Sequence, residues 1–293
     1  MTVRLVTYRA GDQRRTGAML DDHRLVDLAR ATDGALPADM LQLLALGEDG
    51  LARARHALAG APPAAVVVLD ADLVRLDAPV PRPGKALAIG LNYRDHAAEG
   101  GQPLPQRPIV FSKVSTCITG PGMPVQVPRA SEAVDYEGEL CFVIGRRGRH
   151  ITAADALEYV AGYTIGNDVS VRDWQSHNPT WMMGKGFDTH GPIGPWIVTR
   201  DDIPDPHALG IKTYLNGELV QSSNTKHLIF GIPALIEYIS TAFTLEPGDV
   251  VFTGTPAGVG VSRKPPLFMK PGDTVRVEVE RIGALENPVV AEP

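Results

Sequence analysis

Residues 135–144 read DYEGELCFVI, and this stretch decides the fold of the surrounding chain. Its second half is a short apolar run, which predicts a strand entering the core. On a strand, residues two apart face the same side, so Glu137 and Glu139 point together with a glycine between them. Two neighbouring carboxylates repel, and burying both requires a cation or protons. The alternative is a solvent-facing edge strand that carries two exposed charges.

Short apolar runs bounded by Gly, Pro or Asp recur along the rest of the chain. Together with 30 glycines and 25 prolines in 293 residues, they favour many short strands joined by turns over a helical bundle. Residues 214–219, YLNGEL, predict a hairpin, because Asn-Gly supplies two positive-φ residues to a type I′ turn. Residues 232–243 have helical spacing. We therefore expect an α+β fold that is predominantly β.

A linker is predicted at 78–84, where three prolines fall within five positions. Proline fits neither a helix interior nor a central strand. Residues 1–77, which lack lysine, are expected to form a small N-terminal α/β domain, and residues 85–293 the catalytic domain. Within the first domain we expect strands at 3–8, 18–20 and 24–28 and short amphipathic helices at 41–44 and 51–58.

The composition excludes several classes of protein. A formal net charge of −6 argues against a nucleic-acid-binding surface, which is usually basic. No apolar run approaches the ~18 residues of a membrane span, and the N-terminus lacks the apolar core of a secretory signal. Two cysteines, Cys117 and Cys141, provide neither a disulfide framework nor a zinc cluster. We expect a cytoplasmic protein whose partner is a small molecule rather than nucleic acid or a membrane.

A third carboxylate follows the predicted strand that ends at Ile165. In GYTIGNDVSVRDWQ, residues 162–175, this strand leads into a polar turn and then a helical pattern. Asp168 is either the N-cap of that helix or a carboxylate facing the glutamate pair. Three carboxylates completed by water suit Mg²⁺ or Mn²⁺ and leave positions open for a chelating substrate. Arg172 and Gln175 could reach the same pocket and bind an anionic group.

Three further motifs carry candidate residues. His96 and Glu99 are three apart, so a helical turn places them on one face, either as a base with its orienting carboxylate or as a surface ion pair. Lys185, between two glycines, is either a loop tip or a cation held close to a ligand. Residues 254–260, GTPAGVG, lack the P-loop pattern and predict a tight turn whose N–H groups and Thr255 hydroxyl could meet an oxyanion.

Taken in order, six motifs resemble the fumarylacetoacetate hydrolase family. They are GLNYRDHAAE (90–99), DYEGEL (135–140), GYTIGNDVSVRDWQ (162–175), GKGFDTHGPIGPW (184–196), TYLNGE (213–218) and PGDVVFTGTPAGVG (247–260). The N-terminal segment is similar to that of longer members, which include diketo-deoxy-sugar-acid hydrolases and homoprotocatechuate-pathway hydratase-isomerases. The resemblance implies a mixed β-roll core and a homodimer, and two-fold homo-oligomers are common in general.

The resemblance also implies one Mg²⁺ or Mn²⁺ per active site and assigns roles by motif. The implied metal ligands are Glu137, Glu139 and Asp168; the implied catalytic residues are His96, Glu99 and Lys185; the implied substrate-binding residues are Arg172, Gln175, Thr189 and Thr255. In this scheme His96 and Glu99 are the water-activating dyad, and Lys185 faces the substrate.

The family's substrates carry a 2-oxo acid or 1,3-dicarbonyl unit, which chelates a divalent ion that stabilises an enolate. We therefore expect a hydrolase that cleaves a C–C bond in a 2,4-diketo acid or acylpyruvate to give a carboxylic acid and a 2-oxo acid. Decarboxylation of oxaloacetate, and hydration or isomerisation of an unsaturated 2-oxo acid, use the same chemistry and stay open. A non-catalytic module that binds 2-oxo acids is an alternative of another class, against which the dyad and Lys185 argue.

Overall fold

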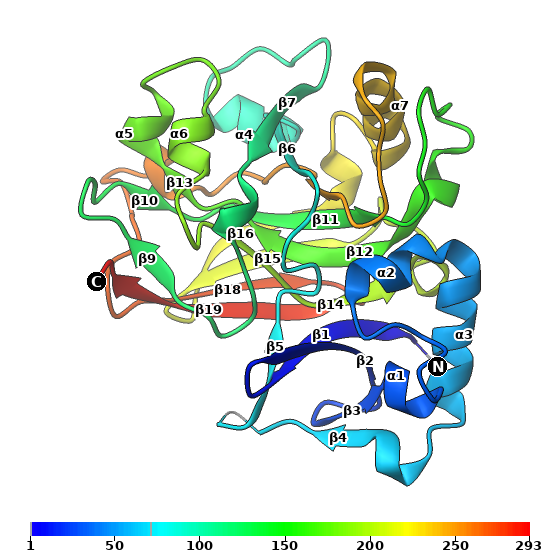
Figure 1. Ribbon diagram of the computed structural model, residues 1–293. Coiled ribbons are helices and arrows are strands. Elements are labelled where there is room, and N and C mark those ends of the chain that lie inside the picture. Colours follow the sequence, from blue (N-terminus) through cyan, green and yellow to red (C-terminus); the bar gives the residue numbers. More distant parts are fainter. Residues whose placement is uncertain (1, 71) are drawn as a thin grey trace.

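The computed structural model describes residues 2–70 and 72–293, and within them the largest feature is a twelve-stranded mixed sheet (Figure 1). Its main path runs through β4 (Val66–Val68), β3 (Arg24–Asp27), β2 (Gln13–Met19), β1 (Arg4–Ala10), β14 (Gly191–Thr199), β12 (Val160–Asn167), β11 (Gly138–Ile144), β17 (Val250–Phe252), β6 (Ala86–Gly90) and β7 (Ile109–Lys113). Off this path, β5 (Val74–Asp77) pairs with β1 and β8 (Ile118–Thr119) pairs with β14. The predicted α+β, predominantly β class is confirmed.

A second sheet of five strands packs beside the first in the described part of the chain. Its order is β16 (Glu218–Asn224), β15 (Gly210–Leu215), β18 (Thr274–Val279), β19 (Gly283–Ala291) and β9 (Val125–Val127). The predicted hairpin is confirmed, because Asn216 (φ 53°) and Gly217 (φ 81°) form the turn between β15 and β16. A short pair, β10 (Val134–Asp135) with β13 (Ser170–Val171), ties the chain before β11 to the chain after β12.

Helices are few and mostly short. They are α1 (Leu28–Ala31), α2 (Met40–Ala45), α3 (Gly47–Ala59), α4 (Arg94–Glu99), α5 (Arg172–Gln175), α6 (Met182–Lys185) and α7 (Ile232–Ala242), with 3₁₀ turns at Pro63–Ala65, Ser115–Cys117, Ala156–Tyr159, Arg200–Asp202, Thr225–His227 and Gly260–Ser262. The helix predicted at 232–243 is confirmed as α7, which buries Leu235 and Ile239 in the cluster that contains Phe142 of β11. Figure 1 shows α4, α5 and α6 on one side of the large sheet, near β6 and β7.

Strand β11 lies inside the large sheet, between β12 and β17, and every residue of it is buried. Its residues alternate between two clusters, since Phe142 packs with α7 while Val143 packs with residues of the N-terminal segment. A strand covered on both faces reads as a continuous apolar run, which explains the sequence LCFVI at 140–144. Glu137 and Glu139 are 5% and 1% exposed, so the edge-strand alternative is wrong.

The N-terminal segment continues the same sheet, because β1 pairs antiparallel with β14 through Leu5 and Ile197. Strand β2 covers Gln13–Met19 and so begins earlier than the predicted 18–20. The reason is the hairpin with β1, whose register pairs Ala10 with Gln13 directly after the turn at 11–12, so the whole of 13–18 joins the ladder. The proline-rich segment at 78–84 joins β5 to β6, and the domain division drawn there stays a prediction. Neither 2–70 nor 72–293 contains a helix of the length and apolarity that crossing a bilayer requires.

Candidate active site

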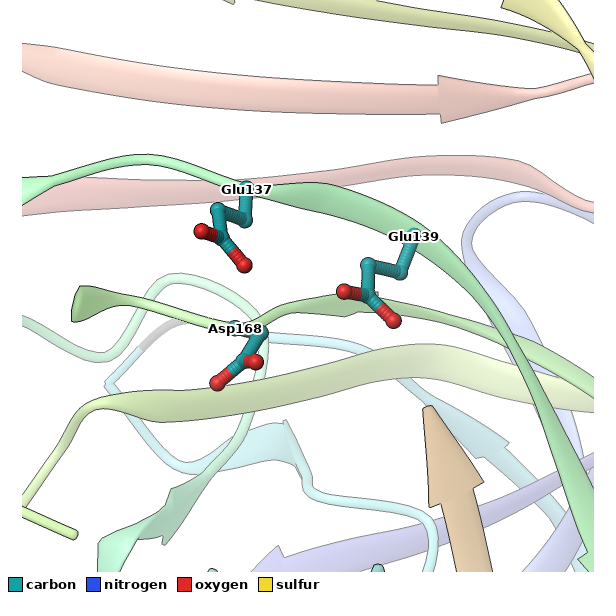
Figure 2. Close-up of side chains that lie close together, drawn as sticks. All are labelled: Glu137, Glu139 and Asp168. Atoms are coloured by element: carbon teal, nitrogen blue, oxygen red, sulfur yellow. The ribbon is translucent and has the colours of Figure 1, made fainter. Parts of the chain in front are cut away.

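Three acidic side chains converge at the ends of β11 and β12 (Figure 2). The antiparallel register pairs Glu139 with Gly166, and the Asp168 N–H donates to the carbonyl of Glu137 at 2.9 Å. One carboxylate oxygen from each of the three residues lies within 4.8 Å of the others. Asp168 therefore faces the glutamate pair, as one of the two sequence interpretations has it. The N-cap alternative is wrong, since the helix α5 begins only at Arg172.

The glycine between the two glutamates allows a close approach of β15. A Cβ atom at Gly138 would lie 2.1 Å from Thr213 Oγ1, a contact that no side chain tolerates. The Gly138 N–H donates to Gln221 Oε1 at 3.0 Å, and its carbonyl accepts the Thr255 hydroxyl at 3.0 Å. Gln221 Nε2 in turn donates to Thr255 Oγ1 at 2.8 Å. The Thr255 hydroxyl thus donates to the backbone in this arrangement, and its predicted contact with a substrate oxyanion stays a prediction.

Positive charges surround the three carboxylates. Lys185 Nζ lies 2.7 Å from both Glu137 Oε2 and Asp168 Oδ2, and its side chain is 3% exposed. The loop-tip alternative for Lys185 is therefore wrong. Arg172 places Nη1 2.7 Å from Glu137 Oε1 and Nη2 2.8 Å from Asp135 Oδ2. Asp135, just upstream of the pair, thereby joins the same charged network.

Lys113 belongs to this network, and sequence reasoning does not identify it. Its Nζ lies 2.5 Å from Asp168 Oδ1 and 2.5 Å from the carbonyl oxygen of Lys185. The side chain is completely buried at the end of β7. The available signal was the alternation along IVFSK, which puts Lys113 on the same buried face as Phe111. A buried lysine requires a carboxylate partner, but the sequence does not say which one.

The surrounding charges and burial shift the pKa values of Glu137 and Glu139 in opposite directions. Burial by itself raises the pKa of Glu137, but the charges of Lys185 and Arg172 outweigh it and lower the pKa to about 2. Burial, together with the negative charges of Asp168 and Glu137, raises the pKa of Glu139 well above its usual value. Three clustered carboxylates, one of them short of positive charge, fit a hard divalent ion such as Mg²⁺ or Mn²⁺.

Helix α4 carries the second constellation. His96 Nδ1 lies 3.3 Å from Glu99 Oε2, as the three-residue spacing predicts. The other oxygen of Glu99 accepts the N–H of Gly258 at 2.9 Å, so the carboxylate is held from two sides. Burial raises the pKa of Glu99, but the bonds from His96 and Gly258 prevail and lower it. The pair is therefore anchored to the 254–260 turn.

Most of these residues share one cavity of about 320 Å³. Its polar lining is Glu137, Asp168, Arg172, Gln175, Lys185 and Thr255; its apolar lining is Ile89, Gly90, Leu91, Phe111 and Trp181; His96 and Gln102 complete it. The volume is at the lower end of the range for small-molecule sites, about 300–1,000 Å³. The cavity thus has a charged side and an apolar side.

Thr189 is not among the described residues that line this cavity. Its hydroxyl accepts the backbone N–H of Gln126 at 2.9 Å, and its φ is 69°. The structure therefore places Thr189 in a turn, where its hydroxyl oxygen holds the backbone of Gln126. Its predicted contact with the substrate stays a prediction.

Residues 85–290 match the family described as Fumarylacetoacetate (FAA) hydrolase C-terminal. The chain belongs to the fumarylacetoacetate hydrolase family. A relative from Xenopus laevis named oxaloacetate tautomerase fahd2, mitochondrial, is 45% identical over 295 residues, which cover 99% of this chain and 91% of the relative. Human oxaloacetate tautomerase FAHD2A, mitochondrial, is 48% identical over 262 residues, or 89% of this chain and 82% of that protein.

Solved structures of fumarylacetoacetate hydrolase family proteins are also similar. A putative HpcE protein from Mycobacterium smegmatis matches with a TM-score of 0.87 and 37% identity, over 99% of this chain and all of that one. The fumarylacetoacetate hydrolase from Exiguobacterium antarcticum matches with a TM-score of 0.84 and 34% identity, over the same shares. The predicted family and its fold are confirmed. The cytoplasmic location and the homodimer stay predictions, and the mitochondrial names belong to the relatives.

Proposed function

We propose that the chain is a divalent-metal-dependent enzyme that interconverts the enol and keto forms of oxaloacetate. The observation that carries this is the three-carboxylate cluster beside Lys185, next to a single cavity that Glu137, Asp168 and Lys185 line together with His96, the partner of Glu99 on α4. The names of relatives at 45% and 48% identity support the substrate. They favour oxaloacetate as the substrate over the diketo acid, and thus argue against the C–C bond hydrolysis expected from the sequence.

The metal site follows from the chemistry of its donors. Glu137, Glu139 and Asp168 would hold Mg²⁺ or Mn²⁺, which supplies a Lewis acid for the carboxylate and 2-oxo oxygens of the substrate. With Asp135 there are four carboxylates against three cationic side chains, so the network carries one net negative charge when all are ionised. A divalent ion reverses that sign. A dianionic oxo acid is therefore attracted more strongly after the ion has bound.

Lys185 supplies a fixed positive charge beside the reacting oxygen. Its ammonium group lies between Glu137 and Asp168, on the charged side of the cavity. When a proton leaves C3 of the substrate, negative charge develops on the 2-oxo oxygen. A preorganised cation at that oxygen stabilises the charge without rearrangement. Lys113 holds the Lys185 backbone and Asp168 together, which fixes where this charge lies.

His96 is the group that moves the proton. Glu99 occupies Nδ1, which leaves Nε2 as the nitrogen available for exchange. From keto to enol, Nε2 takes one proton from C3, and the protonated imidazole then gives a proton to the 2-oxo oxygen. In the reverse direction the proton of the enol oxygen passes through Nε2 back to C3. The step therefore needs no nucleophile and no leaving group.

Hydrolysis is the second candidate, and two observations favour it. The His96–Glu99 pair could equally activate water for attack on a carbonyl, and a structure named fumarylacetoacetate hydrolase matches with a TM-score of 0.84. Decarboxylation of oxaloacetate would use the same centre. Fold and ligands do not separate these reactions, since the walls of the pocket decide specificity.

The first test is turnover by the Mg²⁺-loaded protein. We would follow enol absorbance after adding enol oxaloacetate and identify the products of oxaloacetate and acetylpyruvate by mass. We expect faster conversion of enol to keto oxaloacetate with no change in composition. Carbon dioxide release without faster conversion would replace the proposal with a decarboxylase. Cleavage of acetylpyruvate, with unaffected tautomers, would restore the hydrolase.

The role of His96 is tested by His96→Ala against His23→Ala, an exposed histidine of the N-terminal segment. A general acid–base group typically contributes about 10²–10⁴-fold, so we expect His96→Ala to lose that factor in kcat. Binding of oxalate, which needs only the metal, should stay the same, and His23→Ala should match the wild type. A near wild-type rate for His96→Ala would show that another group moves the proton.

The metal site is tested by Glu137→Gln against Glu218→Gln, an exposed glutamate of β16. A hard ion needs anionic oxygens, so we expect Glu137→Gln to bind Mg²⁺ more weakly by at least tenfold in calorimetry. Its lost activity should return in part with excess metal. Unchanged Mg²⁺ affinity in Glu137→Gln would contradict this ligand assignment.

A further inference from the structure

The apolar side of the cavity is an aromatic wall formed by Gly90, Phe111 and Trp181. The rings of Phe111 and Trp181 meet edge to face, with centroids 5.6 Å apart and an interplanar angle of 75°. Lys185 Nζ lies 5.3 Å from the Phe111 centroid. The wall therefore begins next to the lysine that faces the reacting oxygen, and Trp181 packs on the Phe111 ring.

Backbone geometry fixes the indole ring of Trp181 in this wall. A Cβ atom on Gly90 would lie 2.3 Å from Trp181 Cζ3, so the ring fits only against glycine. Trp181 itself has φ 59°, which is uncommon for a bulky residue and marks a constrained position. Its carbonyl accepts the N–H groups of Gly184 at 2.9 Å and Lys185 at 3.2 Å. The same turn thus sets the position of the indole and the start of the segment that carries Lys185.

The aromatic wall provides apolar surface for a ligand. Trp181 is only partly buried, it lines the cavity, and its indole N–H has no hydrogen-bond partner among the described residues. A carboxylate placed against these rings would lose water without gaining a partner from Gly90 or Phe111. An aromatic group would bury apolar surface there and could pack edge to face on the rings.

We propose that this wall is a subsite for an apolar, planar substituent on C3 of a 2-oxo acid. The enzyme then also catalyses enol–keto exchange of arylpyruvates. The inference rests on the proposed function, which sets the 2-oxo acid head at the carboxylate cluster with its oxygen beside Lys185. From there the short C4 carboxylate of oxaloacetate stays near the ammonium group, whereas an aryl ring on C3 extends past Phe111 to Trp181. The reaction moves one proton from the enol oxygen to carbon and needs no other reactant.

The experiment compares pyruvate and phenylpyruvate, which share the head and differ in the ring. In calorimetry with the Mg²⁺-loaded protein we expect phenylpyruvate to bind about tenfold more tightly, from partial burial of the ring. Trp181→Ala should remove most of that preference and leave pyruvate binding unchanged. The matched control is Met182→Ala, since Met182 is the next residue, is 42% exposed and does not line this cavity. It should keep the preference.

Kinetics give a second measurement on the same variants. Enol phenylpyruvate should convert faster with the wild type, and Trp181→Ala should raise KM for it about tenfold with little change in kcat. Gly90→Ala displaces the indole while keeping it in the protein, so it should also lose the preference. Equal affinity for the two ligands in the wild type, or a preference that survives Trp181→Ala in a folded protein, would overturn the subsite.

Failure of the subsite differs from failure of the proposed function. Oxaloacetate turnover without any preference for phenylpyruvate overturns the subsite alone. In a second outcome, phenylpyruvate binds more tightly in a way that depends on Trp181, but neither enol is converted faster. This result supports the subsite and overturns both the proposed tautomerase and the arylpyruvate activity. Faster conversion of both enols, with the KM effect confined to phenylpyruvate, supports the whole inference.

Discussion

Replacing Lys113 by methionine removes a buried positive charge while keeping much of the side chain's length and volume. In the wild type, Lys113 Nζ bonds to Asp168 Oδ1 and to the carbonyl of Lys185, both at 2.5 Å. After the substitution, four carboxylates face two cations, and Asp168 keeps only Lys185 as a charged partner. We therefore expect the metal-free variant to be less stable than the wild type.

The magnitude follows from the burial of the pair, whose side chains are 0% and 1% exposed. Removing one partner of a buried ion pair costs about 3–5 kcal/mol, because the other charge is left uncompensated. Lys185 still contacts the second oxygen of Asp168, so we expect the lower end, about 3 kcal/mol. Mg²⁺ stabilises any folded protein that binds it, by about 2.7 kcal/mol at 100 times its Kd. The variant has one positive charge fewer beside the carboxylates, so we expect it to bind Mg²⁺ more tightly and to gain more than the wild type at the same Mg²⁺ concentration. The difference in unfolding free energy between the two proteins should therefore narrow when the ion is present.

The assay is urea unfolding followed by circular dichroism, in chelator and in saturating Mg²⁺. The control is Lys212→Met, at an exposed lysine of β15, where we expect a change within about 0.5 kcal/mol. A metal-free Lys113→Met protein within about 1 kcal/mol of the wild type would refute the charge argument. An unchanged deficit in Mg²⁺ would show that the loss comes from packing, not from charge.

Three other predictions concern groups outside the catalytic chemistry. Burial raises the pKa of Asp27, but its hydrogen bonds, first the one from Arg15, lower the pKa overall. The ionised Asp27 therefore stabilises the folded state fully above the unfolded pKa of about 3.9. This stabilisation is lost as the pH falls through the lower folded pKa. Asp27→Asn should lower the free energy of unfolding, measured with urea, by about 2–3 kcal/mol at pH 7 and by less at pH 3. The same loss at both pH values would contradict this dependence on the ionisation of Asp27. Burial lowers the pKa of His190 to about 4. The free energy of unfolding of the wild type should therefore fall by about 3 kcal/mol between pH 6.5 and 4. His190→Gln should remove this dependence on pH. Burial also raises the pKa of Cys117, to about 11, and of Cys141, so a thiol reagent should modify them only after unfolding; fast labelling of the native protein would contradict their burial.

Features that depend on neighbours in the chain were predictable from the sequence. The turn at Asn216 and Gly217 requires positive φ at two adjacent residues, and the sequence supplies both. Helix α7 follows from apolar spacing along one segment. The two-residue spacing of Glu137 and Glu139 puts both on one face of a strand. His96 and Glu99 meet because one helical turn brings them together.

Features that depend on register and packing between distant segments were not predictable in the same way. Lys113 reaches Asp168 across 55 positions of sequence, because β7 lies in the same sheet as β12. Thr189 accepts the N–H of Gln126 across 63 positions, a contact that the motif by itself does not reveal.

The sequence by itself therefore determined the strand-rich class, the family resemblance and the acidic residues of the site. Tertiary structure alone decided how their charges are balanced and which apolar groups face them. The physical reason is that the periodicity of a segment indicates to which side each side chain points. Which residues that side chain contacts depends on sheet register and on packing between distant segments, such as that of Trp181 on Gly90.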